Sequence, residues 1–200
     1  MISASRPVGF CLVLSAPSGT GKTTIAQALL ESDPHVKRSI SMTTRASRTG
    51  EVDGEDYIFT TQSSFRTMVE EGGFLEWAQV HSDYYGTPSA PVKDTINSGG
   101  ISLLVIDVQG GQSVKAIFPD AVLVFLVPPS MESLERRLNA RGTDDESVIR
   151  KRLSQAETEL GYLAEYTYGV VNEDDQQEKT VAKIQSIIAA EHCRVNRWET

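Results

Sequence analysis

The sequence predicts an α/β fold with a three-layer core, in which a parallel sheet lies between two layers of helices. Three observations support this prediction: continuous apolar runs typical of strands buried on both faces, helical patterns that alternate with them, and a glycine-rich turn directly after the first run. Parallel strands need crossover connections, so the alternation favours helices on both faces of one sheet. A chain of 200 residues is long enough for one such core with insertions.

The first strand, turn and helix of the predicted core follow one another near the N-terminus. Residues 10–14 form an apolar run, residues 16–23 a glycine-rich turn, and residues 23–30 a helical pattern that stops before Pro34. Arg6 and the apolar run after it imitate a short signal peptide. Cleavage after that run would destroy the glycine-rich turn, so we expect the segment to belong to the fold.

A small α+β insertion is predicted at residues 37–91. Residues 37–62 are polar and end in a strand-like segment at 56–60, so they are not expected to form a pair of core strands. Residues 65–71 have helical spacing, and residues 74–80 alternate between apolar and polar as a strand does.

The parallel core is predicted to resume after the insertion. Its expected elements are a helix at 91–97, a strand at 101–106, a helix at 111–117, a strand at 121–127 and a helix at 130–140. Residues 141–152 are dense in charge, which predicts a mobile segment between helices. A helix at 153–165, a strand at 168–171 and a helix at 178–190 complete the prediction.

The charge balance limits the classes of partner. Nineteen Lys and Arg residues against 27 Asp and Glu residues give a formal net charge of -8, which repels a nucleic acid backbone and an anionic membrane surface. We therefore expect no nucleic acid and no membrane as partners, so local positive charge must hold any bound phosphate. No apolar run approaches the roughly 20 residues of a membrane span. The two cysteines are too few for a disulfide scaffold, which favours a reducing cytoplasm.

The glycine-rich turn is the strongest functional signal in the sequence. Ala16-Pro-Ser-Gly-Thr-Gly-Lys-Thr23 matches the phosphate-loop pattern at all but its first glycine, where Ala16 stands. Gly19 and Gly21 allow successive N–H groups to face one anion at the start of a helix. Lys22 is expected to reach the β- and γ-phosphates of ATP, and the Thr23 hydroxyl to bind Mg²⁺. The order strand, turn, helix disfavours the alternative of an ordinary glycine turn.

Two arginines in the polar part of the insertion indicate a second phosphate site. Arg45 and Arg48 are three residues apart, and a guanidinium group is suited to bidentate capture of a phosphate. Surface pairing of these arginines with Glu51 or Asp53 is the alternative reading of the same residues. These four residues alone leave both interpretations open.

Several motifs, taken with these arginines, resemble the guanylate kinase family from about residue 8 to residue 190. The resemblance implies a P-loop nucleoside monophosphate kinase that uses ATP with Mg²⁺, accepts GMP and also dGMP, and releases GDP and ADP. It also implies a core at 1–36, 92–137 and 156–200, the last with a C-terminal tail, a GMP-binding insertion at 37–91 and a lid at 138–155. The motifs are Ser41-Met-Thr-Thr-Arg-Ala-Ser-Arg-Thr-Gly-Glu51, Glu76-Trp77, Tyr84-Tyr-Gly-Thr87 and Ile106-Asp-Val-Gln-Gly110.

The same resemblance implies the residues of the GMP site. Guanine carries N–H donors at N1 and N2 and carboxylates are acceptors, while hydroxyl groups can donate to O6. The GMP phosphate would be held by Arg45, Arg48, Tyr57 and Tyr85, the guanine would be read by Ser41, Glu76, Thr87 and Asp107, and Glu51 completes the set.

On the ATP side the resemblance adds residues outside the phosphate loop. Asn172 would contact the adenine, and Arg137, Arg141 and Arg152 would neutralise charge on the transferring phosphoryl group, as an arginine finger does. No general base is expected, because the GMP phosphate has a second pKa of about 6. The expected catalytic residues are Lys22, Arg45, Arg137, Arg141 and Arg152; the ATP-binding residues are Ala16, Pro17, Ser18, Gly19, Thr20, Gly21, Lys22, Thr23, Thr24 and Asn172.

Two other functions are alternatives to the activity that the resemblance implies. A noncatalytic guanylate-kinase-like binding module would use the arginines for phosphopeptides, and intact Gly21-Lys22-Thr23 argues against it. A kinase for another nucleoside monophosphate is disfavoured by Glu76 with Asp107.

The sequence departs from the family pattern at one position. Family members usually carry an acidic residue two positions before the aspartate of the strand end, whereas Val105 stands there in this chain. Positions two apart on a strand face the same side, so the missing carboxylate would have pointed with Asp107 toward the nucleotide. We expect either a greater need for free Mg²⁺ or another carboxylate in the same role.

Overall fold

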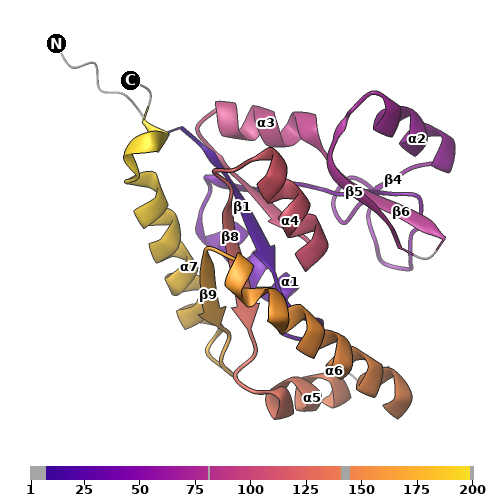
Figure 1. The fold of residues 1–200 in the computed structure, drawn as a ribbon, viewed down its shortest axis with the longest axis vertical. Coiled ribbons are helices and arrows are strands. Elements are labelled where there is room, and N and C mark those ends of the chain that lie inside the picture. The colour runs from indigo at the N-terminus through magenta and orange to yellow at the C-terminus, as the bar shows by residue number, and fades with distance from the viewer. Residues whose placement is uncertain (1–7, 81, 141–144, 199–200) are drawn as a thin grey trace.

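The computed structural model describes residues 8–80, 82–140 and 145–198 (Figure 1). Its core is a five-stranded sheet in the order β2-β7-β1-β8-β9, and all four pairings between neighbouring strands are parallel. The predicted parallel sheet is therefore confirmed. The strands are β1 (Phe10–Ser15), β2 (Val36–Arg38), β7 (Ile101–Val105), β8 (Val122–Val127) and β9 (Tyr168–Val171).

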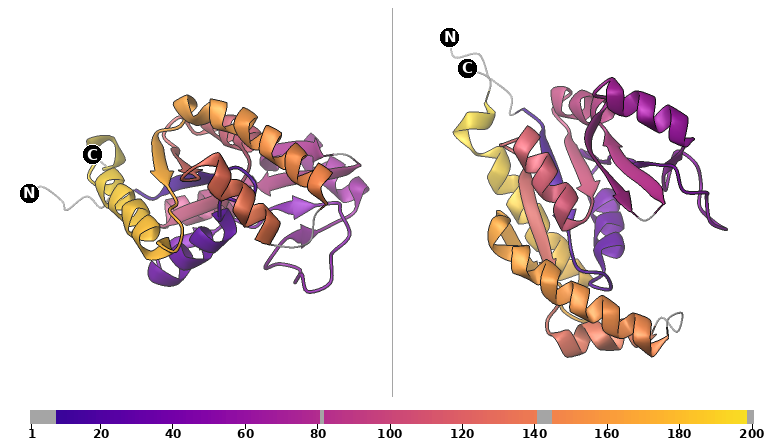
Figure 2. Two further views of the ribbon diagram at one scale, coloured as in Figure 1. Left: turned by 90° about the horizontal axis from the view of Figure 1, so that it is seen from below. Right: turned by 45° about the vertical axis from the view of Figure 1, so that its right-hand side comes forward.

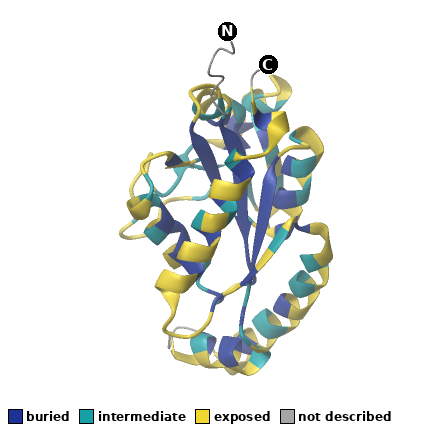
Figure 3. Cartoon of the chain, turned by 90° about the vertical axis from the view of Figure 1, so that its left-hand side faces the viewer, coloured by how far each residue is buried: buried dark blue, intermediate teal, exposed yellow. Residues whose placement is uncertain are grey.

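Helices cover both faces of this sheet. Alternate residues of β1 point to opposite faces: Leu12 and Leu14 pack with α1 and α7, whereas Cys11 and Val13 pack with α3 and α4. Strands β1, β7 and β8 are therefore largely apolar and buried between the helices (Figure 3). The three layers match the prediction. The helices are α1 (Lys22–Ser32), α3 (Ser89–Asn97), α4 (Val108–Ile117) and α7 (Gln177–His192).

The insertion has a sheet of its own, in the order β4-β3-β6-β5. Phe65 on its helix is fully buried and stacks on Phe74 and Tyr84, with ring centroids at 4.4 and 5.5 Å. Figure 2 shows this lobe and the α5–α6 pair as separate projections from the core. The insertion contains β3 (Met42–Thr43), β4 (Ile58–Phe59), α2 (Gln62–Glu70), β5 (Phe74–Val80) and β6 (Asp83–Pro88).

The segment between the last core helices is more helical than predicted. Helix α5 (Met131–Ala140) is followed by α6 (Glu146–Leu160) and a short 3-10 helix, η1 (Gly161–Glu165). Residues 146–152, which were expected to separate two helices, thus belong to α6, and residues 141–144 lie outside the described part. The expected mobility of the segment stays a prediction. Ile149 and Ala156 of α6 lie two helical turns apart and pack on α5. Most of their neighbours in the sequence are charged or polar, so the apolar stripe is too short to predict a helix from its pattern.

The start of the insertion also differs from the prediction. Val36 pairs with Ile101 of β7, so β2 belongs to the core sheet and the predicted boundary at residue 37 falls inside it. Val36 is buried, but the next two residues of this short strand are exposed, which gives the sequence little strand signal. None of the described helices is long and apolar enough to cross a membrane.

Candidate active site

The phosphate loop lies between the end of β1 and the start of α1. Gly19 and Gly21 have φ angles of 90° and 94°, which glycine adopts readily and other residues avoid. A Cβ atom at Gly21 would lie 2.8 Å from the Asn172 amide nitrogen, so this position also has no room for a side chain. The Thr20 carbonyl accepts hydrogen bonds from Asn172 Nδ2 at 2.7 Å and Arg137 Nη1 at 3.1 Å. These two hydrogen bonds therefore fix the backbone of the phosphate loop at Thr20.

A cavity of about 300 Å³ opens above this loop. Lys22 lines this cavity and donates to the Ile106 carbonyl at 3.1 Å. Burial lowers the pKa of Lys22, while the nearby charges of Asp107 and Glu159 act in the opposite direction. The walls are formed by Ala16, Pro17, Ser18, Gly19, Gly21, Lys22, Thr23, Thr24, Asp107 and Glu159, so most of the expected ATP-binding residues lie together.

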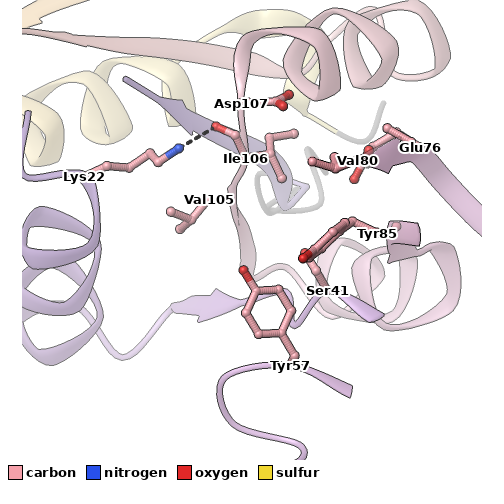
Figure 4. Close-up of a pocket in the computed structure, with 11 residues that line it drawn as sticks. Lys22, Ser41, Tyr57, Glu76, Val80, Tyr85, Val105, Ile106 and Asp107 are labelled. Atoms are coloured by element: carbon pink, nitrogen blue, oxygen red, sulfur yellow. Dashed lines mark hydrogen bonds between the residues drawn. The ribbon is translucent and has the colours of Figure 1, made fainter. Parts of the chain in front are cut away.

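A second cavity, of about 250 Å³, lies between the core and the insertion. Figure 4 shows Lys22 reaching from α1 on one side, while Glu76 and Tyr85 come from the insertion on the other. Five residues of the expected GMP site line this cavity, namely Ser41, Tyr57, Glu76, Tyr85 and Asp107.

Glu76 is the carboxylate of the insertion that faces this cavity. Burial raises its pKa, a hydrogen bond from Thr87 lowers it, and the charge of Asp107 raises it again. Thr87 Oγ1 donates to Glu76 Oε1 at 2.5 Å. The two residues lie opposite each other in the β5–β6 pair, which brings their side chains together.

This contact gives the Thr87 hydroxyl a partner within the protein. Thr87 is buried, with 1% of its surface exposed, and its hydroxyl group donates a hydrogen bond to Glu76. Thr87 therefore orients Glu76 in this structure, and its expected contact with guanine O6 stays a prediction. The sequence could not distinguish these roles, because the pairing depends on the register of β5 and β6.

Asp107 begins helix α4. Its Oδ1 accepts a hydrogen bond from the Gly110 N–H at 2.8 Å, as an N-cap residue does. A Cβ atom at Gly110 would lie 3.4 Å from both Asp107 Oδ1 and Glu76 Oε2, so the first turn of α4 passes close to both carboxylates. Together they form an acceptor-rich end of the second cavity.

Arg45 and Glu51 form a bidentate pair beside the tyrosines of the insertion. The guanidinium donates from Nη1 and Nη2 to the two carboxylate oxygens at 3.0 and 2.8 Å. This pairing raises the pKa of Arg45 and lowers that of Glu51. Arg45 also lies over the Tyr57 ring, 5.5 Å from its centroid.

The structure therefore gives Glu51 a supporting place. Glu51 accepts from the Arg48 N–H at 2.7 Å as well as from the Arg45 side chain, so it fixes the turn that carries both arginines. None of Arg45, Arg48 and Glu51 is among the described residues that line the second cavity. The Arg48 residue is exposed. Asp53, the other suggested partner, instead accepts from the Phe59 N–H at 2.9 Å.

The expected lid arginines occupy different environments. Arg137 donates from Nε to Asp174 at 2.8 Å and from Nη2 to the Asn172 carbonyl at 2.8 Å, in addition to its bond to the phosphate loop. It lines a third cavity, of about 310 Å³, on the other side of the loop, together with Asn172. Arg152 is half-buried on α6, and Arg141 lies outside the described residues.

The Asn172 side chain is buried, and both ends of its amide group form hydrogen bonds within the protein. It is 7% exposed, donates to the phosphate loop and accepts from Thr180 Oγ1 at 2.9 Å. Its place in the third cavity is compatible with an adenine contact, which stays a prediction.

Two residues of the site were missed by sequence analysis. Glu159, near the end of α6, lines the phosphate cavity. Asp174 accepts hydrogen bonds from the Ser133 and Arg137 side chains of α5. Neither belongs to a motif whose spacing signals a nucleotide site. Asp174 lies two residues after Asn172, which is the one hint that the sequence contains.

The fold and the cavities define a class of protein: a P-loop nucleotide-binding protein with room for a second ligand across from the phosphate loop. The model of the guanylate kinase family matches residues 9–191. The chain is 48% identical over 189 residues to the guanylate kinase of Caldanaerobacter subterraneus subsp. tengcongensis, covering 94% of this chain and 91% of that protein. This chain belongs to the guanylate kinase family.

Two further comparisons agree with this assignment. The guanylate kinase of Synechocystis is 50% identical over 169 residues, with 84% of this chain and 88% of that protein covered. The crystal structure of guanylate kinase from Anaplasma phagocytophilum superposes with a TM-score of 0.79 at 35% identity, covering 97% of this chain and 92% of that one. The likeness thus extends over nearly the whole chain.

Proposed function

We propose that this enzyme transfers the γ-phosphoryl group of ATP to GMP and releases ADP and GDP. The observation that carries the proposal is a shared wall: Lys22 and Asp107 line both the phosphate cavity and the second cavity. A donor triphosphate on the loop and an acceptor in the second cavity would therefore meet at Lys22. Family membership supports the same reaction.

The acceptor side favours guanine. Glu76 and Asp107 supply carboxylate acceptors to one end of the second cavity, where the N1 and N2 donors of guanine would pair with them. Adenine lacks a donor at N1. Ser41 supplies a hydroxyl that can donate to O6. Arg45, Tyr57 and Tyr85 would hold the GMP phosphate, and Arg48 would join them from its exposed position.

Mg²⁺ bound with ATP is part of the proposal. Thr23, Asp107 and Glu159 supply a hydroxyl and two carboxylates to the phosphate cavity. Mg²⁺ prefers such oxygen donors and usually takes only one or two from the protein, with phosphates and waters completing the shell. Thr23 would bind the ion directly. When bound, the ion neutralises charge on the β- and γ-phosphates.

The chemical step requires little from the protein beyond positioning and charge. An oxygen of the GMP phosphate attacks the γ-phosphorus, the bond from that phosphorus to the β–γ bridging oxygen breaks, and ADP leaves with the electron pair. Lys22 would stabilise the negative charge during transfer, and Arg141 and Arg152 would join it from the lid. Arg137, the third arginine of this set, would neutralise charge on the same phosphoryl group, and Asn172 would contact the adenine.

The proposal also includes dGMP as an alternative acceptor and the cytoplasm as the cellular location of the enzyme. We include dGMP as a second acceptor, since none of the described residues is assigned to the ribose 2′-hydroxyl. A reducing cytoplasm is consistent with the two cysteines, Cys11 and Cys193, which are both free.

A coupled assay of ADP release tests the function. GMP, AMP, UMP and dTMP are compared as acceptors at saturating ATP and Mg²⁺, and GMP is expected to give the fastest release. Faster release with another monophosphate would assign the enzyme to that substrate. No release with any of the four would favour a noncatalytic binding module.

A further inference from the structure

Glu159 is an acidic residue in the phosphate cavity that the sequence motifs do not explain. It lies one residue before the end of α6, is half-buried, and lines the same cavity as Thr23 and Asp107. Repulsion from the ATP phosphates makes a carboxylate costly there unless a cation lies between them. Lys22 lines the same cavity and supplies one positive charge, and a metal ion bound with ATP would supply more.

The surroundings of Glu159 fix its position. Gln155, one helical turn earlier, donates from Nε2 to Glu159 Oε1 at 2.9 Å. Burial raises the pKa of Glu159, while the hydrogen bond from Gln155 and the charge of Lys22 act against this rise. Glu157, two residues earlier on α6, is exposed. The carboxylate at 159 is thus the one that helix geometry brings to the cavity.

The other acidic group of this cavity is partly committed. Asp107 Oδ1 caps helix α4 through the Gly110 N–H, which leaves its second oxygen for other partners. Val105, at the end of β7, lines the second cavity, and its side chain carries no oxygen. Among the described residues that line the phosphate cavity, Glu159 is therefore the carboxylate free of a capping role.

We propose that Glu159 is a positioning residue for Mg²⁺, accepting hydrogen bonds from the waters that the ion carries when it binds with ATP. It would thereby supply, from α6, the acceptor that a carboxylate at position 105 would supply from β7. The inference rests on the proposed function for the presence of ATP. Outer acceptors of this kind typically change metal affinity by about 10–100-fold.

Calorimetric titration of ATP in the presence of Mg²⁺, and again in EDTA, tests this role without turnover. For Glu159→Gln we expect the ratio of metal-free to Mg²⁺-supported dissociation constants to fall by about tenfold. Metal-free ATP should bind equally well or more tightly, because a negative charge has been removed from the cavity. Glu157→Gln is the matched control and should leave the ratio unchanged.

A merely structural role, or a role as counter-ion of Lys22, gives a different result. In either case Glu159→Gln changes both dissociation constants by the same factor, and an unchanged ratio would overturn the proposal. Rescue gives a second criterion: adding Val105→Asp to Glu159→Gln should restore much of the lost ratio.

Single Val105→Asp keeps the proposal testable if Glu159→Gln fails to fold. With Glu159 already in the role, Val105→Asp alone should raise the ratio by less than about threefold, well below the range for a missing acceptor. A rise of tenfold or more would contradict the proposal. Failure of the kinase function would be seen separately, as no GMP-dependent ADP release by the unmodified enzyme.

Discussion

At the scale of single residues, two side chains that are expected to bind GMP are oriented by neighbours within the insertion. Glu76 accepts a hydrogen bond from Thr87, and Arg45 forms a bidentate pair with Glu51. Glu76 lines the second cavity, whereas Thr87 is not among the described residues that line it. The residue types alone do not reveal these pairings, because they depend on strand register and on the path of a turn.

Lys22→Ala tests the residue that both cavities share. Its ammonium group lies where the ATP phosphates are expected, so we predict a fall in kcat of about 100-fold or more. GMP affinity, measured by calorimetry, should change much less. Near-normal turnover in this variant would contradict the assignment of the phosphate loop.

Glu76 and Thr87 give a prediction about pH. GMP needs the ionised form of Glu76, so protonation as the pH falls should weaken binding. Thr87→Val removes the hydrogen bond that lowers the pKa of Glu76, so this pKa should rise further and the loss of GMP affinity should begin at higher pH.

The matching variant is Glu76→Gln, in which this titration is absent. Its GMP affinity should be lower by about 1–3 kcal/mol at neutral pH and nearly independent of this proton. Calorimetric titrations of GMP between pH 5 and 8 compare the three proteins. Superimposable pH profiles for the unmodified enzyme and Thr87→Val would show that Thr87 does not act through Glu76.

At the scale of elements, sequence patterns identified the long core strands and helices. The runs at β1, β7 and β8 are apolar on both faces, as a parallel sheet covered by helices requires. Short or charged elements were harder to predict. Strand β2 has one buried residue, and helix α6 buries only Ile149 and Ala156 among many charges. Their pairing partners lie far away in the sequence.

The same limit applies to the candidate site. The phosphate loop is a continuous motif, so its residues and their place could be predicted. Glu159 and Asp174 reach the site only because α6 packs on α5 and because the loop after β9 runs beside the phosphate loop. No local spacing encodes those contacts. The phosphate-loop residues could therefore be predicted from a local motif, whereas Glu159 and Asp174 could not, because tertiary packing brings them to the site.

Asp174 connects the base of α5 to the loop after β9. It accepts from Ser133 Oγ at 2.9 Å, from Arg136 Nη2 at 3.0 Å and from Arg137 Nε at 2.8 Å. We predict that Asp174→Ala frees Arg137 and thereby loosens both α5 and the phosphate loop. Amide hydrogen exchange should become faster at the first turns of α5 and at Thr20, with β1 and β7 unchanged.

Glu173→Ala, at the neighbouring position, is the control for this prediction. Uniform acceleration of exchange across the core would indicate general destabilisation. Exchange in α5 equal to that of the unmodified enzyme would show that Asp174 does not hold this helix.

At the scale of the whole molecule, three parts surround the two cavities. The core carries the phosphate loop, and the insertion carries Glu76, Arg45 and Arg48. Helices α5 and α6 form the third part (Figure 2). Strand β5 of the insertion packs against α4 of the core, so the lobe is anchored beside Asp107. Figure 2 shows the insertion and the α5–α6 pair as two separate projections from the core.

Closure of these parts is the expected response to substrates. Phosphoryl transfer to GMP competes with transfer to water, so the γ-phosphate must be enclosed before it reacts. The arginines on the insertion and on α5–α6 have phosphates as their expected ligands, and binding of both nucleotides would draw these parts toward the shared Lys22. In the proposed function GMP binds to the insertion and ATP to the phosphate loop, so neither nucleotide alone is expected to contact both projections.

Small-angle X-ray scattering can measure this closure. We predict that the radius of gyration falls when GMP and a non-hydrolysable ATP analogue are both saturating, and falls less with either ligand alone. AMP in place of GMP is the matched control, because it lacks the N1 donor that Glu76 and Asp107 would accept. An unchanged radius of gyration with both sites filled would mean that the enclosure of the γ-phosphate does not depend on movement of the two projections. The phosphate cavity and the second cavity would then have to exclude water in the arrangement that Figure 1 shows.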